Sequence, residues 1–207
     1  MFQVFTKNLL FSTILFISYS LISEEYKAGK HYQILPQTIA TRDAKKIEII
    51  EFFWFGCGHC YSLENQLKSW EEKLPSDIDF WRSPITWNEM AKTHAKLFFA
   101  AEFFEKPEII SNTFVSIHAN RRMMTSDQEL QPFFASFGIT EDQYLSLFNS
   151  FAMQNKIRRA DTFGLKYQIR GVPAFIVNGK YKVSASNDVG TAELLGVVDY
   201  LINLERD

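Results

Sequence analysis

IEIIEFFWFGCGHC, residues 47–60, is the stretch of sequence that decides the fold. Residues 47–53 are rich in β-branched and aromatic side chains and almost continuously apolar, which is typical of a strand covered on both faces. Gly56 interrupts this run, and an amphipathic helix is predicted over residues 61–74. The apolar side chains at helical spacing are Leu63, Leu67, Trp70 and Leu74. The stretch therefore predicts a central strand that leads, through a cysteine pair, into a helix.

A second strand is predicted shortly after this helix. Pro75 favours the end of the helix, and residues 78–85 have the composition of a strand. A strand, a helix and a second strand in this order predict a right-handed parallel crossover.

Residues 88–164 have a helical pattern throughout, and we expect their aromatic side chains to form a core. Ser126 with Glu129 and Thr140 with Gln143 fit capping boxes, which predict two helix starts. Pro132 falls inside the first of these helices, so we expect that helix to bend or to begin later. The apolar residues that share faces are Ala91, Ala95, Phe98, Phe99, Leu130, Phe133, Phe134, Phe137, Tyr144, Phe148 and Phe151.

The C-terminal part returns to strands. Residues 174–177 and 180–183 flank Asn178-Gly179, a dipeptide that favours a type I′ hairpin turn with positive φ at both positions. A last helix is predicted over residues 191–204, and Leu194, Leu195, Val198 and Leu201 are expected to point inward. The order of elements predicts an α/β protein, with a thioredoxin-like sheet and an inserted all-helical subdomain.

The N-terminus has the pattern of a cleaved signal peptide. One cation, Lys7, precedes an apolar run over residues 9–17, which is shorter than the ~20 residues of a membrane-spanning helix. Cleavage after Ser20 or Ser23 fits equally well. We therefore divide the chain into a signal peptide at 1–23, a first thioredoxin-like part at 24–88, a helical insert at 89–164 and a second thioredoxin-like part at 165–207.

Composition narrows the chemistry. The formal net charge of −2 gives no support for a nucleic-acid partner, and two cysteines in an exported chain suggest a disulfide. A four-thiolate zinc site needs more cysteines, and haem attachment needs a histidine directly after Cys60, where Tyr61 stands. A purely structural bridge would close too short a loop to stabilise the chain much. Redox chemistry is the interpretation that remains strongest.

The predicted helix start gives the two cysteines different roles. Unpaired N–H groups and the positive end of the helix dipole favour a thiolate at Cys57, so Cys57 is the predicted nucleophile. His59 could add a donor or positive charge toward Cys57, which would make the disulfide a stronger oxidant. Cys60, which is deeper and less acidified, is the predicted resolving thiol.

Two segments resemble the signatures of the DsbA family of thiol:disulfide interchange proteins. Residues 51–61, EFFWFGCGHCY, resemble the active-site segment, and residues 170–180, RGVPAFIVNGK, resemble the second signature. The resemblance implies a periplasmic oxidase that holds no cofactor, acts as a monomer on unfolded exported proteins with free cysteines, and is reoxidised by a DsbB-type membrane quinone reductase. It implies a catalytic site made of Cys57, Gly58, His59, Cys60, Val172 and Pro173.

The same resemblance gives meaning to several single residues. Val172-Pro173 is implied to be a cis bond beside Cys57, where its loop could pair with an extended substrate; the alternative is a proline that opens an edge strand. Gly58 replaces the family's usual proline, and Gly-His is typical of protein disulfide isomerase. A disulfide isomerase or reductase therefore remains an alternative, and so does a non-catalytic folding helper that only holds unfolded chains.

Glu51 is unusual because it lies in an otherwise apolar strand. A buried carboxylate is costly unless it is paired or protonated, so the alternative is an edge position that faces water. By resemblance, Glu51, Glu64 and Arg82 fall where the family keeps a charged group beneath the active site. We hypothesise that Glu51 assists proton transfer to or from Cys60.

Overall fold

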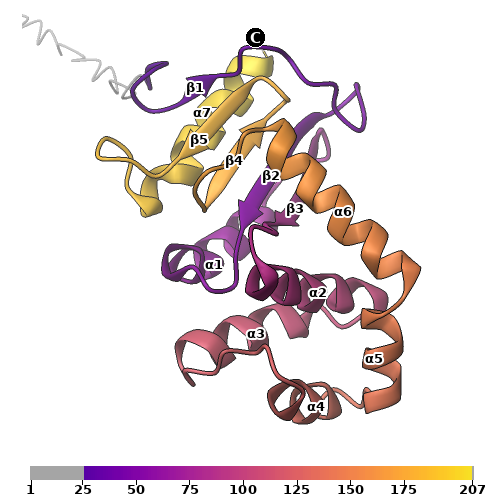
Figure 1. Cartoon of the computed structure of the whole chain (residues 1–207). Coiled ribbons are helices and arrows are strands. Elements are labelled where there is room, and N and C mark those ends of the chain that lie inside the picture. Colours follow the sequence, from indigo (N-terminus) through magenta and orange to yellow (C-terminus); the bar gives the residue numbers. More distant parts are fainter. Residues whose placement is uncertain (1–25, 207) are drawn as a thin grey trace, which may run out of the picture.

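The computed structural model describes residues 26–206, which form a mixed sheet surrounded by helices (Figure 1). The predicted signal peptide lies outside the described residues. The strands are β1 (Gln33–Ile34), β2 (Ile47–Phe53), β3 (Ile78–Pro84), β4 (Ala174–Val177) and β5 (Tyr181–Ser184). The helices are α1 (Gly58–Glu71), α2 (Glu89–Phe103), α3 (Glu108–His118), α4 (Asp127–Ala135), α5 (Glu141–Phe148), α6 (Phe151–Lys166), the 3-10 helix η1 (Thr191–Glu193) and α7 (Leu194–Arg206).

The sheet has the order β1-β5-β4-β2-β3, so β2 is an interior strand. It pairs in parallel with β3 and antiparallel with β4, and α1 connects β2 to β3. Six of its seven residues are buried, from Glu48 to Phe53. The prediction of a central strand followed by a parallel crossover is confirmed.

Helices cover both faces of the sheet. One face packs Ile49, Phe175 and Val183 against the buried sides of α1 and α7. The other face packs Ile50 and Ile176 against Tyr167 at the end of α6. Figure 1 shows α6 and α7 on these opposite sides, with β2 between them. Because both faces are covered, the nearly continuous apolar run of β2 is explained.

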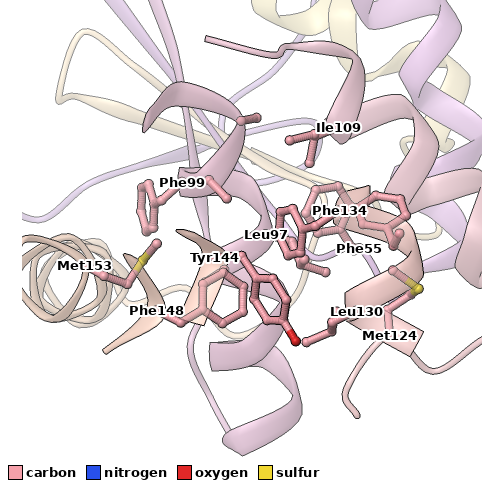
Figure 2. Packing of buried hydrophobic residues seen from close by; sticks show 14 of the residues in the cluster. Phe55, Leu97, Phe99, Ile109, Met124, Leu130, Phe134, Tyr144, Phe148 and Met153 are labelled. Atoms are coloured by element: carbon pink, nitrogen blue, oxygen red, sulfur yellow. The ribbon is translucent and has the colours of Figure 1, made fainter. Parts of the chain in front are cut away.

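Helices α2 to α6 follow β3 and precede β4 along the chain. Their buried side chains build a core of their own (Figure 2). The ring of Tyr144 stacks on Phe134 with a centroid distance of 4.9 Å, and Phe148 meets Phe134 edge to face. Phe55 and Cys60 belong to the same cluster, so this core reaches the end of β2. The expectation that the aromatic stripes form core is confirmed. None of the helices within residues 26–206 has the length and apolar character of a membrane span.

Some element boundaries differ from the prediction. The helix predicted from Tyr61 begins at Gly58, because Cys57 already has the extended backbone of an N-cap. Helix α4 begins at Asp127 and contains Pro132, so it does not begin later; the proline removes a single backbone bond from a short helix. The two-residue strand β1, which pairs with β5, was not predicted.

Of the two capping boxes, one is correct. Thr140 accepts a hydrogen bond from the Gln143 N–H at 3.3 Å, and Gln143 Oε1 accepts one from the Thr140 N–H at 2.8 Å. The box at Ser126 is wrong, because its hydroxyl instead donates to the Glu129 carboxylate. That carboxylate accepts from the N–H groups of the preceding loop, at Met123 and Thr125.

The hairpin turn is confirmed at Asn178 and Gly179, where φ is 48° and 61°. The second strand starts at Tyr181, one residue later than expected. A β-carbon on Gly179 would lie 1.9 Å from the carbonyl oxygen of Ile39, so a side chain does not fit there. The last helix also follows the prediction, since Leu194, Leu195, Val198 and Leu201 are all buried.

Candidate active site

Cys57 lies at the point where the chain turns from β2 into α1. It is the N-cap of α1, and its N–H donates to the Trp54 carbonyl at 3.0 Å. The turn is tight at Gly56, where a β-carbon would lie 2.5 Å from the Trp54 ring. The apolar strand and the glycine together therefore deliver Cys57 to the N-terminus of the helix.

The two thiols, which are free in this structure, have opposite environments. The pKa of Cys57 is lowered to about 6, first by a hydrogen bond with the Cys60 thiol and then by the N–H groups of Cys60 and His59 and the charge of His59, against the effect of burial. The pKa of Cys60 is raised, first by burial and then by Cys57 and the charge of Glu51. Near neutral pH, Cys57 is a thiolate and Cys60 keeps its proton.

The loop at Val172 and Pro173 lies beside Cys57, although 115 positions separate the two in sequence. Cys57 Sγ lies 3.3 Å from the Val172 carbonyl oxygen, to which the thiol donates when it is protonated, and the Val172–Pro173 bond is cis. Pro173 precedes β4, which is paired on one side with β2 and on the other with β5. The alternative of a proline that opens an edge strand is therefore wrong.

His59 is exposed, and its ring contacts a residue that sequence reasoning missed. Its Nδ1 lies 3.2 Å from the hydroxyl of Thr191, at the start of η1. A second contact holds this segment, because Gln66 on α1 donates to the Ala192 carbonyl at 3.1 Å. No sequence signal indicated this pair, since its members are 132 positions apart.

The structure brings Glu51, Arg82 and Glu64 together. Glu51 and Arg82 are direct neighbours on the paired strands β2 and β3, and the Arg82 guanidinium donates to Glu51 Oε2. The same guanidinium donates to both oxygens of Glu64 on α1, at 3.0 and 2.8 Å. It also lies over the ring of Phe53, 4.3 Å from the centroid. The charged group is thus held by a strand pair and a helix.

Glu51 is fully buried, so the alternative of an edge position facing water is wrong. Burial raises the pKa of Glu51 to about 7, although the charge of Arg82 acts to lower it. Its second oxygen, Oε1, has no hydrogen-bond partner among the described residues. Glu51 can therefore exist with or without a proton near neutral pH, close enough for its charge to act on Cys60.

Helix α3 contacts the active-site segment through another pair that sequence reasoning missed. The ring of His118 stacks on Tyr61 with a centroid distance of 4.7 Å, and its Nε2 contacts the Phe55 carbonyl oxygen at 2.7 Å. Across residues 26–206, no three His, Cys, Asp or Glu side chains gather in a way that could hold a metal ion.

Known proteins match this chain in sequence and in overall fold. The model of the DSBA-like thioredoxin domain family matches residues 64–194. The chain is 35% identical over 185 residues to the thiol:disulfide interchange protein DsbA of Pseudomonas aeruginosa, covering 89% of this chain and 88% of that protein. The chain belongs to the DsbA family. It is therefore a thiol:disulfide oxidoreductase with a thioredoxin-like fold and inserted helices.

Other members of the DsbA family agree with this assignment. DsbA of Azotobacter vinelandii is 35% identical over 188 residues, covering 90% of this chain and 88% of that protein. The crystal structure of Pseudomonas aeruginosa DsbA matches with a TM-score of 0.82 at 34% identity, over 89% of this chain and 96% of that one. The predicted fold class is confirmed.

Proposed function

We propose that this chain is a periplasmic oxidase that donates the Cys57–Cys60 disulfide to exported proteins as they fold. A client thiolate attacks the sulfur of Cys57, which forms a mixed disulfide and releases Cys60 as a thiolate that takes up a proton. A second client thiolate then attacks the client sulfur of the mixed disulfide. The client gains its disulfide, Cys57 leaves as a thiolate, and two electrons pass from client to enzyme.

The observation that carries this proposal is the unequal acidity of the two thiols. A pKa of about 6 makes Cys57 a good leaving group and stabilises the reduced enzyme. Stabilising the reduced form makes the disulfide more oxidising. The raised pKa of buried Cys60 keeps the second sulfur protonated and away from clients, so attack is directed to Cys57.

Further roles are assigned to the surrounding groups. Glu51 takes and returns the proton of Cys60, supported by its pKa of about 7 and by a buried oxygen that has no hydrogen-bond partner in the described part of the chain. Arg82 and Glu64 hold the Glu51 carboxylate in place. Val172 presents its backbone beside Cys57, where an extended client segment can pair by strand addition. Gly58 leaves the N-terminus of α1 open, because nothing lies within 4 Å of where its β-carbon would be.

The partners and location follow from the family and from the predicted signal peptide at residues 1–23. The clients are unfolded exported proteins with free cysteines. A DsbB-type membrane quinone reductase returns the electrons to a quinone, and this chain acts as a monomer without a cofactor of its own. An exported location also suits a chain whose two cysteines form one redox pair.

Equilibration of the purified chain with glutathione buffers tests the proposal. We expect a reduction potential well above the −270 mV or so of thioredoxin, toward the roughly −120 mV of DsbA. A value near that of thioredoxin would contradict an oxidase. The Gly58-His59 pair supports a disulfide isomerase as the second candidate. An isomerase should refold a protein with scrambled disulfides at a rate that matches the rate at which it oxidises a reduced protein.

Two cysteine variants separate catalysis from simple binding. When Cys60→Ser is mixed with a client that already contains a disulfide, the Cys57 thiolate should attack that disulfide, release one client thiolate and accumulate as a mixed disulfide, detectable by mass spectrometry, because Cys60 is missing and cannot displace the client. Cys57→Ser should lose all exchange. If Cys57→Ser still assisted client refolding as well as the unchanged chain, a non-catalytic folding helper would be the better description.

A further inference from the structure

A cationic groove begins next to the loop that carries Val172. Its volume is about 500 Å³. A second cavity of about 540 Å³ shares Gln33, Gln168 and Lys182 with it, so the two hollows adjoin each other. The groove is lined by Gln168, Arg170, Gly171, Ala174, Lys182 and Ser184.

The charged side chains of this groove are all cations. Arg170 and Lys182 line it, Lys166 lines the adjoining cavity, and neither hollow is lined by a carboxylate. Lys182 Nζ donates to the Gln168 carbonyl at a long 3.5 Å, and no ion pair links Arg170 or Lys182 to an acid in residues 26–206. Burial and then the charge of Arg170 lower the pKa of Lys182. An anion in the groove would relieve this repulsion.

The groove is continuous with the place where a client would be bound. Gly171 lines it and is followed directly by Val172, whose carbonyl contacts Cys57. Lys182 pairs with Ile176, four residues beyond Val172 along the chain. At about 3.3 Å per residue, this separation is about 13 Å along an extended strand.

An extended chain would also find an open strand edge here. Strand β1 pairs only with Tyr181 and Lys182 of β5. Beyond Lys182, no strand of the described chain covers the outer edge of β5 at Ser184. Unpaired edges of this kind accept added strands.

We infer that this groove selects clients with acidic residues near the reactive cysteine. The inference rests on the proposed oxidase function and adds a substrate preference to it. A client segment that pairs at Val172 runs past Arg170 toward Lys182. The side chains of Lys182 and of the client's acidic residue span part of the distance of about 13 Å between Val172 and the level of Lys182. The acidic residue therefore lies about two to four positions from the client cysteine.

The test compares dithiol peptides that differ at one position, two to four residues on either side of the attacking cysteine. That position carries Glu, Gln or Lys, and the oxidation rate is measured with the oxidised full-length chain. We expect the Glu peptide to react about two- to five-fold faster than the Gln peptide, as for an exposed ion pair. The Lys peptide should be slower, and the differences should vanish in high salt.

Variants assign the preference to the groove. Lys182→Gln and Arg170→Gln should each reduce the preference, and Lys182→Glu should reverse it. Lys73→Gln removes a cation near Pro75 and Ile78, at the opposite end of β3 from the active site, and should keep the preference. Thermal unfolding curves and the glutathione equilibrium verify that each variant is folded and active.

The outcomes distinguish this inference from the proposed function. If no peptide is oxidised, the oxidase proposal fails. If all peptides are oxidised at one rate, or if Lys182→Glu leaves the preference unchanged, the groove inference is overturned and the oxidase proposal stands.

Discussion

The guanidinium of Arg82 binds Glu51 across two neighbouring strands, and the second oxygen of that buried carboxylate has no hydrogen-bond partner within residues 26–206. A second acid, Glu64, binds the far side of the same guanidinium. One cation therefore faces two carboxylates, and burial raises the pKa of Glu51 to about 7. A group in this state can exchange a proton at the pH where disulfide exchange takes place.

Glu51→Gln should slow the attack of a client thiolate on Cys57, because in that step Cys60 leaves as a thiolate and takes up a proton. The amide has the same shape but cannot carry the proton of Cys60, so the rate should fall by about 10- to 100-fold, at or below the usual effect of one acid–base group. The rate should also lose its pH dependence near pH 7, as measured by stopped-flow mixing with a reduced peptide. Glu64→Gln is the matched control and should keep that dependence. An unchanged pH–rate profile in Glu51→Gln would remove the proton-transfer role.

The stability of the reduced form relative to the oxidised form should rise with pH. The pKa of Cys57 is about 6 when folded, below the ordinary value of 9.0, so between these values the unfolded chain holds a proton that the folded chain has released. The reduced chain therefore gains stability as pH rises above about 6, with a slope of at most about 1.4 kcal/mol per pH unit, and loses it as pH falls through 6. Urea unfolding of both forms between pH 5 and pH 8 or so measures the difference.

The oxidised form is the internal control for this measurement. It contains Glu51 but no titrating thiol, and below about pH 8 Cys60 is protonated whether the chain is folded or not. A difference between the two forms that stays constant over this range would show that Cys57 is not acidified.

Gly58→Pro should make the centre more oxidising. Gly58 is the first residue of α1, a position that favours proline, and a side chain there has open space. Proline would restrict the chain and hold the N–H groups of His59 and Cys60 toward the Cys57 sulfur. We expect the potential to rise by up to about 60 mV, the difference between protein disulfide isomerase and DsbA. Gly58→Ala, which adds a side chain without the ring, should shift it less; an equal shift would contradict the argument from restriction.

Thr191→Val should weaken the effect of His59 on Cys57. The hydroxyl of Thr191 contacts His59 Nδ1 and holds the ring near the active site, whereas valine has the same shape without the contact. We expect a higher pKa for the Cys57 thiol, measured from the absorbance of the thiolate near 240 nm. We also expect a glutathione equilibrium constant about two- to five-fold less oxidising, as for the loss of one modest hydrogen bond.

Two further variants test whether this effect passes through His59. Thr191→Ser retains the hydroxyl and should behave like the unchanged chain. In a His59→Ala background, Thr191→Val should have no further effect. An equal effect in both backgrounds would mean that Thr191 acts on the fold and not through His59.

The elements with strong local patterns could be predicted from the sequence. The apolar run of β2, the Asn178-Gly179 turn and the inward residues of α7 are each determined by near neighbours in the chain. The segments around the cysteine pair and around Val172-Pro173 each resemble a signature of the DsbA family. That resemblance predicted that two segments far apart in the chain form one site.

The errors came from contacts that local patterns do not encode. The Ser126 box failed because the Glu129 carboxylate binds N–H groups of the loop before α4, which competes with the expected cap. Thr191 was missed because its contact with His59 depends on how α7 packs against α1. The pairing of Glu51 with Arg82 required the register of two strands, and the cationic groove required the whole sheet.

The position of helices α2 to α6 has a consequence for biosynthesis. Strand β2 pairs with β4, and the entire helical block lies between them in the chain. The sheet is therefore dominated by pairings between distant parts of the chain, which slows folding. While the chain is being made, Cys57 is present long before Val172 can reach it. The nascent enzyme is then itself an unfolded chain with two unprotected thiols, and so resembles the clients that it later oxidises.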